Sequence, residues 1–466
     1  MGRQITRSDM IWGYLAQALN LGGGLLLLPI SARYLSPEDL GLWFVFSALA
    51  GLAQLMELGF QPTFARNAAY VYAGAQQLVK TGLPERTEGG APAINVDLLA
   101  SLLQAARTVY RAVAALAAVV MLLFGSLYIT TLLTRQQDVA QSLLAWGMFS
   151  LGAIINFYFG YINAFLQGRG DITQGSKVTV FSRGSMVLLS VSALLMGYGL
   201  LGLGVASLLS AAVGRVTAHH YFTKDGLIER LRTAAVTAAN NKALLRTLWH
   251  NAGRLGVVQV GAFLIQRGNV LIAASFVGLA ASGSYGITVT VLMALSGMAS
   301  VICQLQLPHL ASLQAAYNRK GAAEVLGETL LMSWIFYSLG LTVLVVAGNE
   351  VLSMIGSRNH LLPWPLCLML GIVLLLEMNH SIAASYLTTL NKVPFVGAAI
   401  VSGVGVTLLT LLLIKPFGIA GMVAAQGIVQ LAYNNWKWPM EAVRHLELSP
   451  SNILVLGARK IVSRCV

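Results

Sequence analysis

Five arginines lie inside long apolar stretches of this chain, where a charged side chain is unexpected. They are Arg66, Arg183, Arg215, Arg254 and Arg267. A charge within hydrocarbon is costly unless it faces protein or water, so these positions are candidates for function. At about 1.5 Å of rise per residue, the first four fall in the same half of their helices. The planar guanidinium suits phosphate and carboxylate groups, and the pattern therefore indicates a cationic cavity for an anionic ligand.

Each of the first four arginines also has a simpler interpretation, in which its long side chain extends to the nearby membrane surface. For Arg66 and Arg215 we favour neither the cavity nor the membrane surface over the other. For Arg183 and Arg254 we favour the cavity, because both lie well inside their stretches.

Arg267 follows Arg254 by thirteen residues, which is about 220° around an ideal helix. The two arginines can face one cavity only if this helix bends, and Gly256 or Gly261 would permit a bend. The alternative for Arg267 is a pairing with carbonyl groups of a neighbouring helix.

Two acidic residues also lie within apolar stretches. Glu57 shares a helix face with Gln61, and Glu377 precedes His380 by three residues. A carboxylate in such a place can titrate or hold Na⁺, and it would then couple transport to an ion gradient. For Glu57 a buried salt bridge to one of the arginines is the interpretation that we place first.

The first apolar stretch contains three successive glycines, Gly22 to Gly24, after the polar residues Gln17 and Asn20. Glycines weaken a helix, and broken helices are common at the binding sites and hinges of transporters. Close packing of small residues between helices is the alternative.

Composition assigns the chain to the membrane proteins. Of its 466 residues, 56% are hydrophobic and 10% are charged, and the mean hydropathy is +0.72. A soluble domain carries about 25% charged residues, and a disordered chain has few apolar residues. The net charge of +13 would suggest nucleic acid in a soluble protein, but in a membrane protein it reflects topology, so no nucleic acid is expected.

No enzyme constellation is present in the sequence. The three cysteines show no metal-binding spacing, and there is no Gly-Lys-Ser/Thr nucleotide loop. The segment Gly168-Arg169-Gly170 is predicted to be a loop. It is not a dinucleotide-binding fingerprint, because no strand precedes it. We therefore expect no catalytic residue, no metal site and no cofactor, apart from a coupling Na⁺ or H⁺.

Twelve apolar stretches follow one another, six on each side of a basic segment. At about 20 residues per membrane-spanning helix, they predict an all-α polytopic membrane protein with about 12 transmembrane helices in two six-helix lobes. The predicted parts are a lobe over residues 1–222, a cytoplasmic basic linker over 223–247, a lobe over 248–436 and a cytoplasmic tail over 437–466. The stretches are 11–35, 40–72, 108–133, 139–167, 175–198, 200–222, 248–277, 281–317, 323–347, 361–388, 394–414 and 418–436.

Two features support this layout. With both termini in the cytoplasm, 21 Lys and Arg residues lie on the cytoplasmic side, 4 on the opposite side and 5 within the stretches, as the positive-inside rule requires. A faint repeat also relates the halves, because Gly199 to Ala206 and Gly418 to Ala425 share a Gly-x-x-Gly pattern that ends in Ala, at an offset of 219 residues. An even number of helices per half makes such repeats parallel.

The first hundred residues resemble a known family. The sequence Ala32-Arg-Tyr-Leu-Ser-Pro-Glu-Asp-Leu-Gly-Leu-Trp43, followed by Glu57-Leu-Gly-Phe60 and then Arg66, is similar to the start of the Wzx-type polysaccharide and O-antigen flippases. These belong to the multidrug/oligosaccharidyl-lipid/polysaccharide (MOP) exporter superfamily, whose MATE-like layout of twelve helices in two lobes the whole chain follows in pattern. The loop over 73–107 is longer than in a typical member.

The resemblance implies a function and a set of roles. The protein would move undecaprenyl-diphosphate-linked oligosaccharide from the cytoplasmic to the periplasmic leaflet of a bacterial inner membrane, by alternating access, for lipopolysaccharide or other surface polysaccharide assembly. A polysaccharide polymerase and a chain-length regulator would be partners, beside the lipid bilayer. Contacts to diphosphate or acidic sugars would come from Arg66, Arg183, Arg254 and Arg267, and hydrogen bonds to sugar from Tyr14, Gln17, Asn20 and Gln61.

Three other functions compete. MATE-type multidrug exporters handle mostly cationic drugs and would prefer an acidic cavity, whereas five arginines and two glutamates of this chain lie more than five residues from the ends of its stretches. A lipid II flippase typically has fourteen helices. A scaffold subunit of a glycan assembly machine would leave the arginines dispensable.

Overall fold

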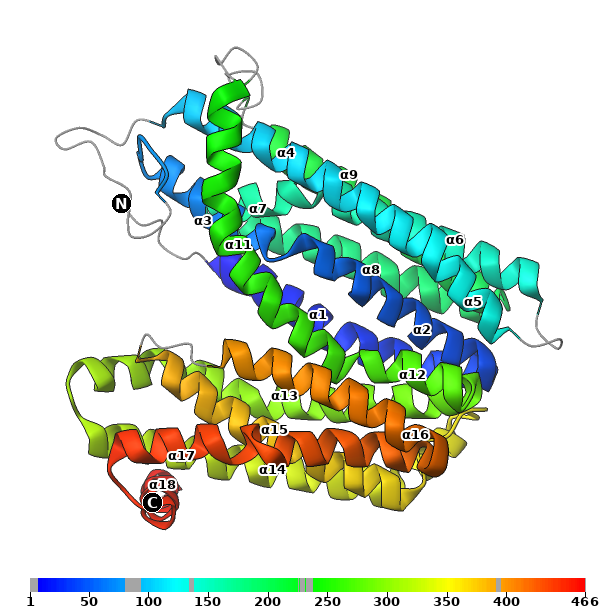
Figure 1. The fold of residues 1–466 in the computed structure, drawn as a ribbon, viewed down its shortest axis with the longest axis vertical. Coiled ribbons are helices and arrows are strands. Elements are labelled where there is room, and N and C mark those ends of the chain that lie inside the picture. Colours follow the sequence, from blue (N-terminus) through cyan, green and yellow to red (C-terminus); the bar gives the residue numbers. More distant parts are fainter. Residues whose placement is uncertain are drawn as a thin grey trace. The chain divides into compact units, whose positions relative to one another are not determined.

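The structure is a computed structural model (Figure 1) that describes residues 7–79, 94–133, 138–224, 226, 231, 238–390 and 395–465. These residues fold almost entirely into helices, and η1 and η2 are short 3₁₀ and π segments. The elements are α1 (Arg7–Tyr34), α2 (Pro37–Gln54), η1 (Leu55–Glu57), α3 (Phe60–Tyr72), α4 (Val96–Ala118), η2 (Val119–Gly125), α5 (Ser126–Leu132), α6 (Val139–Tyr158), α7 (Gly160–Gly168), α8 (Ile172–Leu195), α9 (Gly199–Thr223), α11 (Ala238–Gln266), α12 (Gly268–Phe276), α13 (Leu279–Ala315), α14 (Arg319–Met354), α15 (Trp364–Thr388), α16 (Val396–Ala432), α17 (Asn434–Leu446) and α18 (Pro450–Cys465).

The described helices match the lengths that a bilayer demands. Nine helical segments of the described chain are long and apolar enough to cross a membrane, and α1 makes a tenth if its two halves, which are bent by 41°, form one pass. The bend separates Asn20 from Gly22, where the glycine run predicts a weakened helix. The chain is therefore an all-α, multi-pass membrane protein.

The last of these segments, Val396–Leu446, contains two passes joined at Gly418. This glycine has φ 58° and ψ −138°, which interrupts α16. Asn434 Nδ2 donates to Ser402 Oγ at 2.8 Å, so residues equally distant from Gly418 lie side by side, as in a helical hairpin. The stretches predicted over 394–414 and 418–436 are the two arms of this hairpin, which Figure 1 shows turning back on itself.

The helices α8 and α9 form a matching hairpin in the first half of the chain. Gly197 and Gly199 occupy the turn with φ 83° and 52°, and Ser182 Oγ donates to the Ser210 carbonyl at 3.4 Å across the two arms. Gly199 and Gly418 are the first residues of the sequence repeat. Both need a positive φ that side chains disfavour, which gives the repeat a structural reason.

The stretch predicted over 248–277 is interrupted at Arg267, where α11 ends and α12 begins. This break lies after Gly256 and Gly261, the two glycines that would permit a bend. A Cβ on Gly256 would collide with Leu58, and one on Gly261 would collide with the Ala399 carbonyl. These two glycines serve close helix packing instead.

The described chain divides into two compact units. Unit 1 comprises Met1–Leu35 and Val45–Val260, and unit 2 comprises Ser36–Phe44 and Gly261–Val466. The start of α2 belongs to unit 2 because Gly41 lies against the backbone of Leu279. The predicted boundaries of 1–222, 223–247, 248–436 and 437–466 stay a prediction, and linker residues 225, 227–230 and 232–237 lie outside the described residues.

Two helices of unit 1 are broken and restarted. Between η1 and α3, Leu58 and Gly59 both have positive φ, at 46° and 73°. Between α6 and α7, Phe159 leaves the helical conformation before Gly160 starts the next segment. Past these breaks, α3, α7 and the start of α4 share a hydrophobic core that includes Phe64.

Close glycine contacts in unit 1 generate a stability prediction. A Cβ on Gly204 of α9 would collide with the Ala145 carbonyl of α6, whereas Gly147 of α6 has nothing within 4 Å of its Cβ position. We expect Gly204→Ala to destabilise the protein by about 1–3 kcal/mol through overpacking. Gly147→Ala should be neutral or stabilise it by up to about 1 kcal/mol, because alanine favours helix. Thermal unfolding in detergent measures both, and equal shifts would contradict the packing.

Candidate functional site

A polar cluster in unit 1 joins the two helix breaks. Glu57 ends η1, directly before Leu58, and its Oε1 accepts a hydrogen bond of 2.6 Å from the hydroxyl of Tyr110 on α4. Arg215 of α9 donates from Nη1 to the Phe159 carbonyl at 3.3 Å. The Nε atom of Arg215 is buried without a hydrogen-bond partner among the described residues. The cluster thus holds one acid, one phenol and one guanidinium in the interior of the unit.

The geometry assigns Glu57 a partner that differs from the sequence expectation. The expected salt bridge to an arginine is replaced, among the described contacts, by the Tyr110 hydroxyl. Tyr110 is 1% exposed, and its ring fills the space that a Cβ on Gly160 would need. The side chain that holds Glu57 therefore also packs against the α6–α7 break.

Unit 2 contains a second half-buried acid, Glu377 on α15, which faces amides of α16. Gln426 Nε2 donates to Glu377 Oε1 at 2.8 Å, and Gln430 forms a further side-chain hydrogen bond with the carboxylate. Both glutamines are buried. Two amide groups thus converge on one carboxylate inside the unit.

More distant residues fix the direction of these amides. Asn269 of α12 donates to Gln426 Oε1 at 3.4 Å, and Asn434 donates to Gln430 Oε1 at 2.8 Å. Because each glutamine oxygen is already an acceptor, each NH₂ group is left to face Glu377. Donated hydrogen bonds favour the ionised carboxylate, so the two amides offset part of the cost of a negative charge at this position.

His380 lies one helical turn after Glu377 on α15. Its Nδ1 donates to Asn435 Oδ1 at 2.7 Å, so it contacts α17 while Glu377 contacts α16. The structure places the two titratable groups on neighbouring turns but gives them different partners. Their spacing of three residues predicted a shared site for Glu377 and His380. The hydrogen bonds show that the two side chains have different partners.

The four arginines predicted to bind an anion lie at separate places. Arg66 on α3 and Arg183 on α8 are exposed side chains of unit 1. Arg254 belongs to α11, but its side chain lies outside the described residues. Arg267 lies in unit 2, at the α11–α12 break. The described contacts do not gather these arginines into one cluster.

The polar residues predicted to meet sugar are carried by α1 and α3. Tyr14, Gln17 and Asn20 are exposed on α1, and Tyr14 is 76% exposed. Gln61 of α3 is half-buried and follows Glu57 by four residues, across the break at Leu58 and Gly59. The α1 residues are accessible to a ligand, while the break interrupts the helix face that Glu57 and Gln61 were predicted to share.

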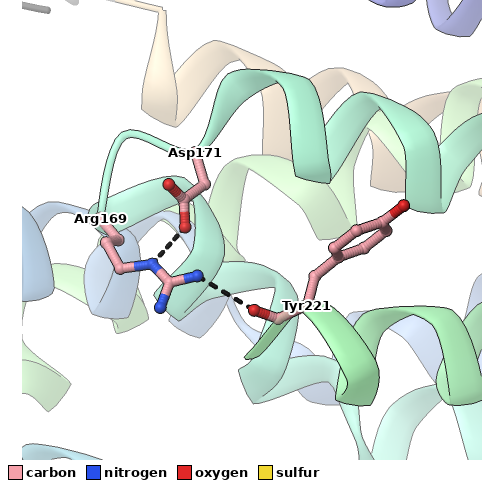
Figure 2. Close-up of polar contacts among 3 residues, drawn as sticks. All are labelled: Arg169, Asp171 and Tyr221. Atoms are coloured by element: carbon pink, nitrogen blue, oxygen red, sulfur yellow. Dashed lines mark hydrogen bonds and ion pairs between the residues drawn. The ribbon is translucent and has the colours of Figure 1, made fainter. Parts of the chain in front are cut away.

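Arg169 forms a further cluster in unit 1, at the turn between α7 and α8 (Figure 2). Its guanidinium pairs with Asp171 through Nε and donates from Nη2 to the Tyr221 carbonyl at 3.1 Å. Nearby, the Lys177 ammonium lies 5.2 Å from the ring centre of Trp12 and 6.0 Å from that of Tyr221. Arg169 and Gly170 thus form a turn, whereas Gly168, predicted to be part of the same loop, is the last residue of α7. Through Arg169 this turn links α8 to the end of α9.

Sequence reasoning missed several residues of both clusters. Tyr110 carries no local signal, because a tyrosine in an apolar helix is commonly a core residue. The series Gln426, Gln430 and Asn434, however, repeats every four residues within an apolar stretch. Such spacing places the three amides on one helix face, and it is the signal that marks a polar partner there.

Comparison with known proteins identifies the fold. No protein-family model and no curated protein matches the sequence. An inward-facing multidrug resistance MATE family transporter of the MOP superfamily has 12% identity and a TM-score of 0.66, over 93% of this chain and 99% of that chain. The lipid II flippase MurJ, in an inward closed conformation, has 10% identity and a TM-score of 0.61, over 97% and 90% of the two chains.

A third solved structure agrees with these two. The MATE multidrug transporter DinF-BH has 13% identity and a TM-score of 0.58, over 97% of each chain. All three alignments extend over nearly the whole length of the chain at low identity. The chain therefore has the all-helical membrane fold that these MATE and MurJ transporter structures share.

Proposed function

We propose that this protein is a flippase for undecaprenyl-diphosphate-linked oligosaccharide, which it moves from the cytoplasmic to the periplasmic leaflet of a bacterial inner membrane by alternating access. The observation that carries the proposal is the excess of arginine over acid within the membrane-spanning stretches, on a fold that a lipid flippase shares. A diphosphate with acidic sugars needs cationic contacts. Both termini would face the cytoplasm, with a polymerase and a chain-length regulator as partners.

The distribution of charge supports one assignment of roles to the two units. Unit 1 contains Arg66, Arg183 and Arg254, together with the accessible polar residues of α1. We assign the diphosphate and sugar contacts mainly to this unit, with Arg267 as the contribution of unit 2. Glu377, with its two amide donors, is the favoured ion-coupling residue, and Glu57 is the second candidate.

Multidrug export is the competing function, and a specific observation favours it. Two of the three solved structures described above are MATE transporters. A cationic drug, however, would be repelled by the arginines that unit 1 contains. The charge of the transported molecule is therefore the property that separates the two functions.

The first functional prediction concerns Arg66 and Arg183. We expect Arg66→Ala and Arg183→Ala each to slow flipping of a fluorescent lipid-diphosphate oligosaccharide in proteoliposomes by about tenfold or more, because a hydrogen bond to a charged group contributes about 1.5–3 kcal/mol. Arg358→Ala, at an exposed arginine predicted to lie on the opposite side, is the matched control and should leave the rate unchanged.

The same vesicles test the competing functions. One outcome would overturn the flippase proposal in favour of drug export. In that outcome, uptake of a cationic dye is faster than flipping of the lipid-linked substrate, and the Arg66→Ala and Arg183→Ala variants take up the dye at the unchanged rate. Flipping of lipid II at an equal rate would favour a lipid II flippase. Absence of transport for every substrate, with full surface polysaccharide in cells carrying the variants, would favour a scaffold role.

The second functional prediction concerns ion coupling. We expect Glu377→Gln to abolish the stimulation of flipping by an imposed Na⁺ or H⁺ gradient while slower flipping without a gradient persists, because the amide cannot carry the charge. Glu350→Gln, at an exposed position of α14, is the control. If the gradient still stimulates Glu377→Gln but not Glu57→Gln, the coupling role moves to the Glu57 and Tyr110 pair.

A further inference from the structure

The C-terminal helix α18 is a packed part of unit 2. It crosses α14 so closely that a Cβ on Gly457 would collide with the backbone of Gly327. Figure 1 shows α18 along its own axis while α14 and α17 run across the view. The helix therefore crosses the bundle of unit 2 at a steep angle, and a helix with that orientation lies along a membrane surface when its neighbours span the membrane.

A buried ion pair fixes this crossing. Glu328 of α14 is 1% exposed, and the Lys460 ammonium of α18 approaches its Oε2 to 3.4 Å. Removing one partner of such a pair leaves an uncompensated buried charge, which is strongly destabilising. The ion pair thus sets which face of α18 points inward and which face remains outside.

The level of the crossing coincides with the edge of the hydrocarbon layer. After Glu328, the next charged residue of α14 is Glu350. The uncharged residues between them span about 32 Å at 1.5 Å each, which equals the roughly 30 Å thickness of a bilayer core. Glu328, and with it α18, is therefore placed at one boundary between the acyl chains and the headgroups.

The outer face of α18 has the composition of a membrane-surface helix. Val455 and Val462, seven residues apart, are 48% and 62% exposed. Arg459 lies exposed between them, and the sequence from Pro450 to Cys465 contains no acidic residue. Apolar and cationic side chains on one helix bind the interface by burying area in the acyl boundary and by attraction to anionic lipid.

We propose that α18 is an interfacial helix whose outer face binds the anionic phospholipid headgroups of the adjacent leaflet. Val455 and Val462 reach the acyl chains, and Arg459 contacts lipid phosphate. The inner face of α18 holds α14 at the same depth in the membrane, through the Gly457 contact and the Lys460 ion pair. The attachment gives unit 2 a fixed depth in the membrane, independently of which substrate the protein carries.

The experiment places an environment-sensitive fluorophore at single cysteines. Cys465 is first replaced by serine, while Cys303 and Cys367 are buried and stay. An NBD label at Val455→Cys or Val462→Cys, in full-length protein reconstituted with phosphatidylcholine and phosphatidylglycerol, should show blue-shifted emission and quenching by lipids with a spin label at the upper acyl chain. The matched control is Tyr317→Cys, at a 92% exposed position of the α13–α14 turn, which should remain unquenched.

The headgroup contact is tested by Arg459→Ala in the Val462→Cys background. We expect the phosphatidylglycerol fraction needed for half-maximal quenching to rise about fivefold, since a basic residue near an anionic surface contributes about 1 kcal/mol. Labels at 455 and 462 that are as water-exposed as the label at 317 would overturn the proposal and favour a protein partner, because these vesicles contain none. Quenching without any phosphatidylglycerol dependence would overturn the headgroup assignment.

Discussion

Inside a bilayer, every polar group must find its partner within the protein, and this constraint organises the structure. Each helix break interrupts the regular backbone ladder, and side chains add to the bonds that the carbonyls at the breaks still accept from the backbone. At the α2–α3 break, the Gly59 carbonyl accepts a hydrogen bond of 3.0 Å from the Thr63 hydroxyl. At the α6–α7 break, the Phe159 carbonyl accepts one from Arg215. The polar residues of unit 1 thus gather where the backbone is interrupted.

The same constraint explains why the two half-buried acids, Glu57 and Glu377, have such different surroundings. Glu57 lies beside a break, where a phenol from α4 reaches it. Glu377 lies in the middle of an unbroken α15 and faces one side of α16, so its donors come from residues spaced by four along that helix. Amide donors stabilise a carboxylate without cancelling its charge, so the carboxylate remains able to attract a cation. A guanidinium at the same place would hold the carboxylate permanently.

The sequence predicted the membrane class and marked the glycines at which the hairpins turn as the first residues of a repeat, because hydropathy and glycine placement act locally. Gly199 and Gly418 are examples, since a positive φ is a property of the residue itself. The breaks at Phe159 and Arg267 were not predicted, because neither residue is a helix breaker and the interruption depends on tertiary contacts. The partners of Glu57 and Glu377 come from residues 53 and 49 positions away, and no local pattern specifies such a pairing.

The charge distribution bears on how an alternating-access transporter of this fold would use its halves. Four of the five arginines in the apolar stretches belong to unit 1, whereas the amide-bound carboxylate belongs to unit 2. An anion and a coupling cation that bound side by side would attract each other directly. Under the roles that we propose, the anion would bind mainly to residues of unit 1 and the cation to a residue of unit 2. Each ligand would then influence the other by shifting the conformational equilibrium, because a ligand moves an equilibrium only through its different affinity for the two states.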